Sequence, residues 1–151
     1  MGGGHNWQAT AYSPQTGLYY FGSTDGCAMY FKTKQEYIEG GWYQASTGQG
    51  VPREPSTGSI VAVNPATGDV KWRFEMVSGP SAGLLATAGG LVFGGDREGY
   101  VFALDARTGK PLWKFQTGGT AIAPPISYAV GGTQYIAVAG GGSMIAFRLA
   151  R

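Results

Sequence analysis

The chain contains two copies of one segment, and this repeat constrains the fold more than any other feature of the sequence. The first copy, GSIVAVNPATGDVKWRF, begins at Gly58, and the second, GYVFALDARTGKPLWKF, begins at Gly99. The copies align without gaps at a separation of 41 residues. A period of about 40–50 residues is typical of the four-stranded blades of a β-propeller. The repeat therefore predicts similar sheets that follow one another around an axis.

The centre of each copy reads as a tight turn between two strands. A strand ends at Asn64 or Asp105, whose side chain can accept hydrogen bonds from backbone N–H groups two residues further on. Gly68 and Gly109 follow, and glycine adopts the positive φ of a chain reversal at low steric cost. We expect both turns to join neighbouring antiparallel strands.

The strand after each turn carries an aromatic pair. Trp72 and Phe74 in the first copy, and Trp113 and Phe115 in the second, stand two residues apart and so share one face of a strand. A large flat indole that recurs once per repeat suits packing between neighbouring sheets. Both tryptophans are predicted to be structural.

Composition supports an all-β fold and excludes several function classes. Glycine accounts for 27 of the 151 residues, and short Val, Ile, Tyr and Phe runs lie between the glycine-rich turns. The net charge of +2 comes from scattered residues, so nucleic-acid binding has no support. No apolar run approaches the roughly 20 residues of a membrane span. With His5 as the only histidine, His/Cys zinc sites and Ser-His-Asp hydrolysis are not supported, and Cys27 is expected to be a small buried filler.

The repeats divide the chain into parts of about three blades, with approximate limits 1–57, 58–98 and 99–151. Residues 24–57 interrupt the rhythm and read as a long excursion between strands, of the kind that often lines a binding face. Three blades cannot close a ring and would leave a strand edge unpaired at each end. We therefore expect an N-terminal remainder of the propeller outside this sequence.

Several segments, taken in order, resemble the alcohol dehydrogenases that carry pyrroloquinoline quinone (PQQ). The pattern A-x-(D/N)-x-x-T-G-x-x-x-W at 62–72 and 103–113 resembles their tryptophan-docking motif. GLLATAGGLVF at 83–93 is similar to their G-x-L-A-T-A-G-x-L-V-F stretch, and 118–142 resembles their last blade. GGHNWQATAY at 3–12 resembles the family's G-G-x-N-W-x-x-x-x-Y entry to an earlier blade. The resemblance implies the C-terminal arc, about three blades long, of an eight-bladed propeller.

The resemblance also implies an activity. Proteins of this family oxidise alcohols or similar substrates with PQQ and a Ca²⁺ or lanthanide ion, and they pass electrons to a cytochrome c-type acceptor. It further implies a periplasmic location, with a signal peptide in the N-terminal remainder. The family's metal ligands, catalytic aspartate and cysteine pair lie upstream of this region, so no catalytic residue and no metal ligand is assigned here. The chain by itself is expected to be inactive.

Three residues are candidates for cofactor contact. Asn6 and Trp7 match the Asn-Trp pair that contacts the polar edge of PQQ in the family, and their N–H groups can bind carboxylate and quinone oxygens without adding charge. Ser81 stands where many family members have a tryptophan near the cofactor, and its hydroxyl is a candidate hydrogen-bond donor. From the residues alone, Asn6 would be a turn residue and Trp7 a packing residue.

An alternative function uses the same fold without the cofactor. Propellers with the same docking motif include non-catalytic scaffolds and assembly factors, and the missing tryptophan at Ser81 is compatible with such a role. A WD-type interaction propeller is disfavoured because the tryptophan follows Thr-Gly and does not precede an aspartate.

Overall fold

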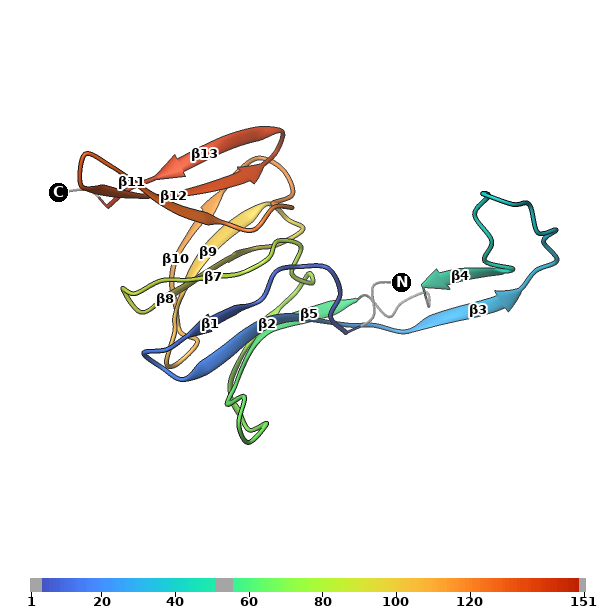
Figure 1. Cartoon of the computed structure of the whole chain (residues 1–151), viewed down its shortest axis with the longest axis horizontal. Coiled ribbons are helices and arrows are strands. Elements are labelled where there is room, and N and C mark those ends of the chain that lie inside the picture. The colour runs from blue at the N-terminus through green and yellow to red at the C-terminus, as the bar shows by residue number, and fades with distance from the viewer. Residues whose placement is uncertain (1–3, 51–55, 150–151) are drawn as a thin grey trace.

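The computed structural model describes residues 4–50 and 56–149, and every regular element within these residues is a β-strand. Three antiparallel sheets lie one above another, and a two-stranded hairpin extends away from them (Figure 1). The all-β prediction is confirmed. The prediction that the closed ring has eight blades is not tested and stays a prediction.

The first sheet is built from two strand pairs that are distant in sequence. Its order is β1 (Ala11–Ser13), β2 (Leu18–Asp25), β5 (Thr57–Val63) and β6 (Val70–Met76). The hydrogen-bonded pairing of β2 with β5 closes the 24–57 excursion at its base.

The second and third sheets follow along the chain. The second has the order β10 (Pro111–Gln116), β9 (Tyr100–Asp105), β8 (Leu91–Gly95) and β7 (Leu85–Ala86). The third has three described strands, which are β11 (Ile126–Val130), β12 (Thr133–Gly140) and β13 (Ser143–Phe147). In this sheet β13 pairs with β12 along one side only, and its other edge is open among the described residues.

The sheets divide the chain at other positions than the predicted blade limits. The limit at 57/58 falls inside the first sheet, because β5 pairs with β2, and the limit at 98/99 falls inside the second, because β9 pairs with β8. A repeat period sets the spacing between equivalent strands but leaves open where one sheet ends. Each copy of the repeat therefore supplies the last two strands of one sheet, and the segment that follows the copy supplies the first strands of the next sheet.

The buried indole of Trp72 joins the first sheet to the second. Its Nε1–H donates to the carbonyl of Ala106 at 3.0 Å, and the ring covers Gly109, where a Cβ would lie 2.5 Å from Cε3. The Tyr20 hydroxyl donates to the same carbonyl at 3.0 Å, and its ring centroid lies 5.6 Å from that of the indole. Only 8% of Trp72 is exposed. The predicted docking role of Trp72 is confirmed.

Trp113, at the equivalent position of the second copy, is not docked in the same way. It is 38% exposed, and its ring meets Phe147 edge-on at 4.9 Å. At the other end of the stack, Gly68 has φ of +78° but no atom within 4 Å of an ideal Cβ. The described residues thus hold one complete docking contact, a tryptophan without its turn, and a turn without its tryptophan.

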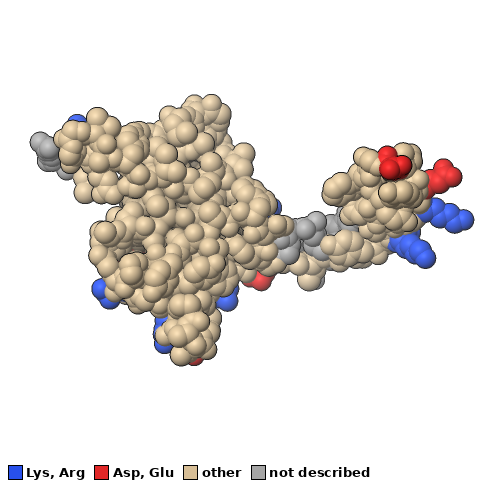
Figure 2. All heavy atoms as spheres, in the orientation of Figure 1, with Lys and Arg blue, Asp and Glu red and all other residues tan. Residues whose placement is uncertain are grey.

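The excursion forms an arm with its own internal order. Strands β3 (Ala28–Lys32) and β4 (Ser46–Gly50) pair antiparallel and lead away from the sheets (Figure 1). Near the tip, the Gln35 side chain donates to the carbonyl of Trp42 at 2.6 Å and accepts from the N–H of Gln44 at 2.9 Å. Large apolar side chains of the arm are solvent-exposed, and charged side chains gather at its far end (Figure 2).

The Asp105 turn makes a testable prediction about acid titration. Its Oδ1 accepts hydrogen bonds from the Thr108 hydroxyl and N–H and from the Arg107 N–H, each at 2.9 Å. The bond from the Thr108 side chain is the largest cause that holds the pKa of Asp105 below its ordinary value. We expect Thr108→Val to raise this pKa, measured by NMR titration of the carboxyl. Because the folded pKa is lowered, the turn's stabilisation is present above the unfolded pKa and is lost as pH falls through the folded one. An unchanged Asp105 titration in the variant would contradict this origin.

Candidate functional site

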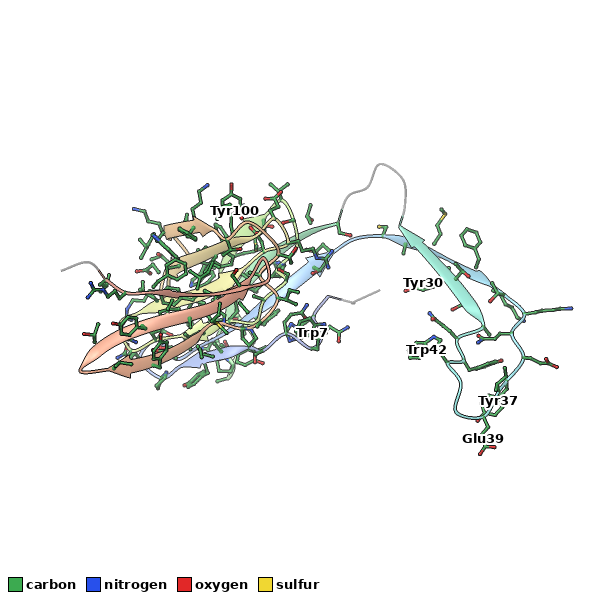
Figure 3. All side chains as sticks on the ribbon, turned by 90° about the horizontal axis from the view of Figure 1, so that it is seen from above. Trp7, Tyr30, Tyr37, Glu39, Trp42 and Tyr100 are labelled. Carbon is green, nitrogen blue, oxygen red and sulfur yellow. The ribbon has the colours of Figure 1, made fainter. Side chains whose placement is uncertain are left out.

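A cavity of about 740 Å³ opens at the end of the sheets from which the arm extends. Its wall combines the N-terminal segment, the end of β2, the base of the arm, the β6–β7 connection and the β8–β9 turn. Trp7 lies at the end of the sheets that faces the arm, and Tyr30 lies on the arm (Figure 3). Segments far apart in the sequence therefore meet around one space.

The N-terminal segment is fixed to the sheets on both sides of the candidate pair. Before the pair, the carbonyl of Gly4 accepts from the Thr24 N–H at 2.7 Å, and the His5 Nδ1–H donates to the carbonyl of Gly22 at 2.9 Å. After the pair, the carbonyl of Ala9 accepts from the Leu84 N–H at 2.8 Å. The only histidine thus has a structural role, since it holds the segment against β2.

Asn6 and Trp7 both line the cavity, as the sequence prediction requires for a shared ligand. Both side chains are exposed, and Trp7 keeps 63% of its surface open to solvent. Among the described residues neither the Asn6 amide nor the Trp7 indole N–H has a hydrogen-bond partner in the protein. Their donors are therefore available to a bound molecule. Contact with a cofactor stays a prediction.

Ser81, the third candidate for cofactor contact, is not among the residues that line this cavity. It is 8% exposed, and its hydroxyl donates to the buried carbonyl of Ala121 at 2.7 Å, which links the β6–β7 and β10–β11 connections. The neighbouring Pro80 forms part of the cavity wall instead. Because the Ser81 hydroxyl already donates its hydrogen bond within the protein, it acts as a structural link between these two connections.

Two charged residues of the cavity were not predicted from the sequence. Arg97 belongs to a charged turn that reads as an ordinary hairpin connection, and Asp25 ends β2, yet both line the cavity. The signal available in the sequence was positional. The β8–β9 turn and the 24–57 excursion each follow the second strand of a sheet, so both emerge at the same end of the stack.

Other candidate chemistry is limited in the described part of the chain. Residues 4–50 and 56–149 contain no group of three or more His, Cys, Asp or Glu placed to hold a metal ion. The expectation that Cys27 is buried is wrong, because it lies exposed at the start of the arm. Nor do these residues form any helix with the length and apolar character needed to cross a membrane.

The stacked sheets and the docked indole define an arc of a tryptophan-docked β-propeller with a cavity on one end of its sheets. A family model described as "Outer membrane protein assembly factor BamB" matches residues 56–150, and the chain belongs to this family of PQQ-type propeller repeats, PQQ_2. The family takes its name from the quinone cofactor and its description from an assembly factor. Membership alone therefore leaves both an enzyme and a scaffold open.

Comparison with individual proteins favours the enzymes. The quinoprotein ethanol dehydrogenase of Pseudomonas aeruginosa is 41% identical over 138 residues, which are 90% of this chain and 22% of that protein. The 1-butanol dehydrogenase (cytochrome c) of Thauera butanivorans is 36% identical and also matches 90% of this chain. The crystal structure of quinohemoprotein alcohol dehydrogenase from Comamonas testosteroni superposes with a TM-score of 0.81 at 32% identity, over 92% of this chain and 22% of that one. The resemblance to PQQ-dependent alcohol dehydrogenases is confirmed, and this chain spans about a fifth of their length.

Proposed function

We propose that this chain is one arc of a periplasmic PQQ-dependent dehydrogenase that oxidises alcohols and passes electrons to a cytochrome c-type acceptor. The observation that carries the proposal is the Asn6-Trp7 pair, held at the cavity with its hydrogen-bond donors unused. Relatives named as ethanol and butanol dehydrogenases support the substrate class, and the name 1-butanol dehydrogenase (cytochrome c) supports the acceptor.

The two half-complete docking contacts support the arc. Within 4–50 and 56–149, the Trp113 indole covers no glycine turn, and no indole covers the turn at Gly68. The open edge of β13 similarly leaves room for a fourth strand in the third sheet. A further sheet on each side would complete these contacts by the geometry already seen between Trp72 and Gly109. The ring that results would close the strand edges.

The residues of the cavity fit PQQ by their chemistry. PQQ is a flat tricarboxylate with quinone oxygens, and when bound it supplies the capacity to take up two electrons from the substrate. The Asn6 amide and the Trp7 indole offer neutral N–H donors to its oxygens. Trp7, Tyr30 and Pro80 add apolar surface along the same wall. These side chains orient a ligand, whereas the proposed Ca²⁺ or lanthanide ligands belong to other parts of the protein.

A scaffold role remains the second candidate because the matching family model is described as an assembly factor. Pro80 and the inward-facing Ser81 leave the cavity without the aromatic wall that many of the dehydrogenases have at this place. A scaffold would need no ligand in the cavity. Cofactor binding therefore separates the two functions.

The test reconstitutes the complete polypeptide that contains this chain with PQQ and Ca²⁺ or a lanthanide, followed by dye reduction with short alcohols. We expect alcohol-dependent reduction, and we expect Asn6→Ala to weaken PQQ binding about tenfold through the loss of a hydrogen bond to a charged ligand. The matched control is Asn64→Ala, in a turn between β5 and β6 that is not part of the cavity wall, which should leave PQQ affinity unchanged. A polypeptide that binds no PQQ would overturn the enzyme in favour of the scaffold.

A further inference from the structure

The β8–β9 turn presents one cation to the cavity from a rigid backbone. Asp96, only 9% exposed, accepts at Oδ1 from the Tyr100 N–H at 2.8 Å, and its own N–H donates to the carbonyl of Tyr100 at 2.9 Å. The Thr120 hydroxyl donates to the carbonyl of Arg97 at 3.0 Å and ties the turn to the next connection. The point from which the Arg97 side chain leaves the protein is therefore well fixed.

The guanidinium of Arg97 is not used within the described part of the chain. Its side chain is exposed, and the ion pairs among the described residues join Lys71 to Asp69 and Arg73 to Glu75. Of the lysines and arginines that the structure describes, only Arg97 contributes to the cavity wall. Asp25 lines the same cavity without pairing with Arg97. An exposed guanidinium on a fixed turn, with no partner among the described residues and with two neutral donors on the same cavity wall, is suited to an anionic ligand.

We propose that Arg97 binds a carboxylate of the cofactor and so anchors the anionic end of PQQ at this cavity. The inference deepens the proposed function and rests on it. A guanidinium matches a carboxylate in a planar, two-bonded arrangement, which adds orientation as well as attraction. Asn6 and Trp7 then bind the remaining polar edge without charge. The Asp25 carboxylate repels the ligand, so the two charged residues that the described chain places at the cavity, Asp25 and Arg97, have opposite effects on binding.

The experiment measures PQQ binding by the complete polypeptide without catalysis, by titration calorimetry of the metal-loaded, PQQ-free protein at low and moderate salt. We expect Arg97→Gln to raise the dissociation constant of PQQ about tenfold and to reduce its dependence on salt. Arg97→Lys should recover part of the affinity, because it restores the charge without the planar fork. Asp25→Asn should tighten binding by about threefold at low salt, because a repulsive charge is removed.

Arg73→Gln is the matched control, since this arginine pairs with Glu75 and contributes nothing to the cavity. It should bind PQQ as the unmodified protein does. If Arg97→Gln binds PQQ with unchanged affinity and salt dependence, Arg97 is a solvated turn residue and the inference is wrong while the proposed function stands. If the unmodified protein binds no PQQ, the proposed function itself fails, and the inference falls with it.

Discussion

Replacing Trp72 with alanine should lower the free energy of unfolding of this chain by about 3–5 kcal/mol, the usual cost of truncating a buried aromatic residue. The indole is 8% exposed and belongs to the core cluster that the first and second sheets share. Its removal leaves a cavity beside Tyr20 and Gly109 and deletes one of the two hydrogen bonds to the Ala106 carbonyl. The loss therefore combines apolar burial, packing and a buried polar contact.

Urea unfolding followed by far-UV circular dichroism measures this effect without relying on tryptophan fluorescence. Trp42→Ala is the control of the same chemistry, because this indole lies on the arm and is 84% exposed. It should change the free energy of unfolding by less than about 0.5 kcal/mol. Equal destabilisation by the two substitutions would mean that the sheets are not held together through Trp72.

Sequence reasoning succeeded where local chemistry decides the structure. Gly68 and Gly109 have φ of +78° and +71°, as the turn prediction requires. The side chains of Asn64 and Asp105 each accept a backbone hydrogen bond from the residue two positions further on. These features depend on a few consecutive residues, so the repeat was sufficient to predict them.

Sequence reasoning failed where contacts between distant segments determine the structure. The blade limits required knowledge that β2 pairs with β5 across the arm, a partnership that no local pattern encodes. The role of Trp113 also depends on its surroundings, because its sequence matches that of Trp72 while its indole keeps 38% exposure. Two copies of one motif can thus form a complete or an incomplete docking contact, depending on whether a neighbouring sheet supplies the other half.

The candidate site divides along the same line. Asn6 and Trp7 were predicted from a contiguous motif, and the structure brings both to one cavity. Ser81 was chosen by position alone, but the direction of its side chain is set by its bond to Ala121, 40 residues away. Arg97 enters the site only because turns from successive sheets converge, so its position in the sequence becomes informative only once the strand order is known.

The last prediction uses the two glycines that occupy the same position of the repeat. Gly109→Ala should lower the free energy of unfolding by about 2–5 kcal/mol, because an alanine at positive φ costs about 1–2 kcal/mol and the added methyl overpacks the site by about 1–3 kcal/mol more. The methyl would lie 2.5 Å from Cε3 and 2.7 Å from Cδ2 of the Trp72 ring, which is buried and cannot move aside. Gly68→Ala meets no atom within 4 Å, so in this chain it should cost the backbone contribution alone.

A double-mutant cycle separates the two contributions. In a Trp72→Ala background the steric conflict disappears, so Gly109→Ala should then cost no more than Gly68→Ala does in this chain. If Gly109→Ala keeps its full cost there, the effect arises from the backbone and the docking contact is not its cause. In the complete polypeptide, the proposed preceding sheet would place its own indole over Gly68. Gly68→Ala should then become as costly as Gly109→Ala, because a contact that is half complete in this chain would be completed by the ring.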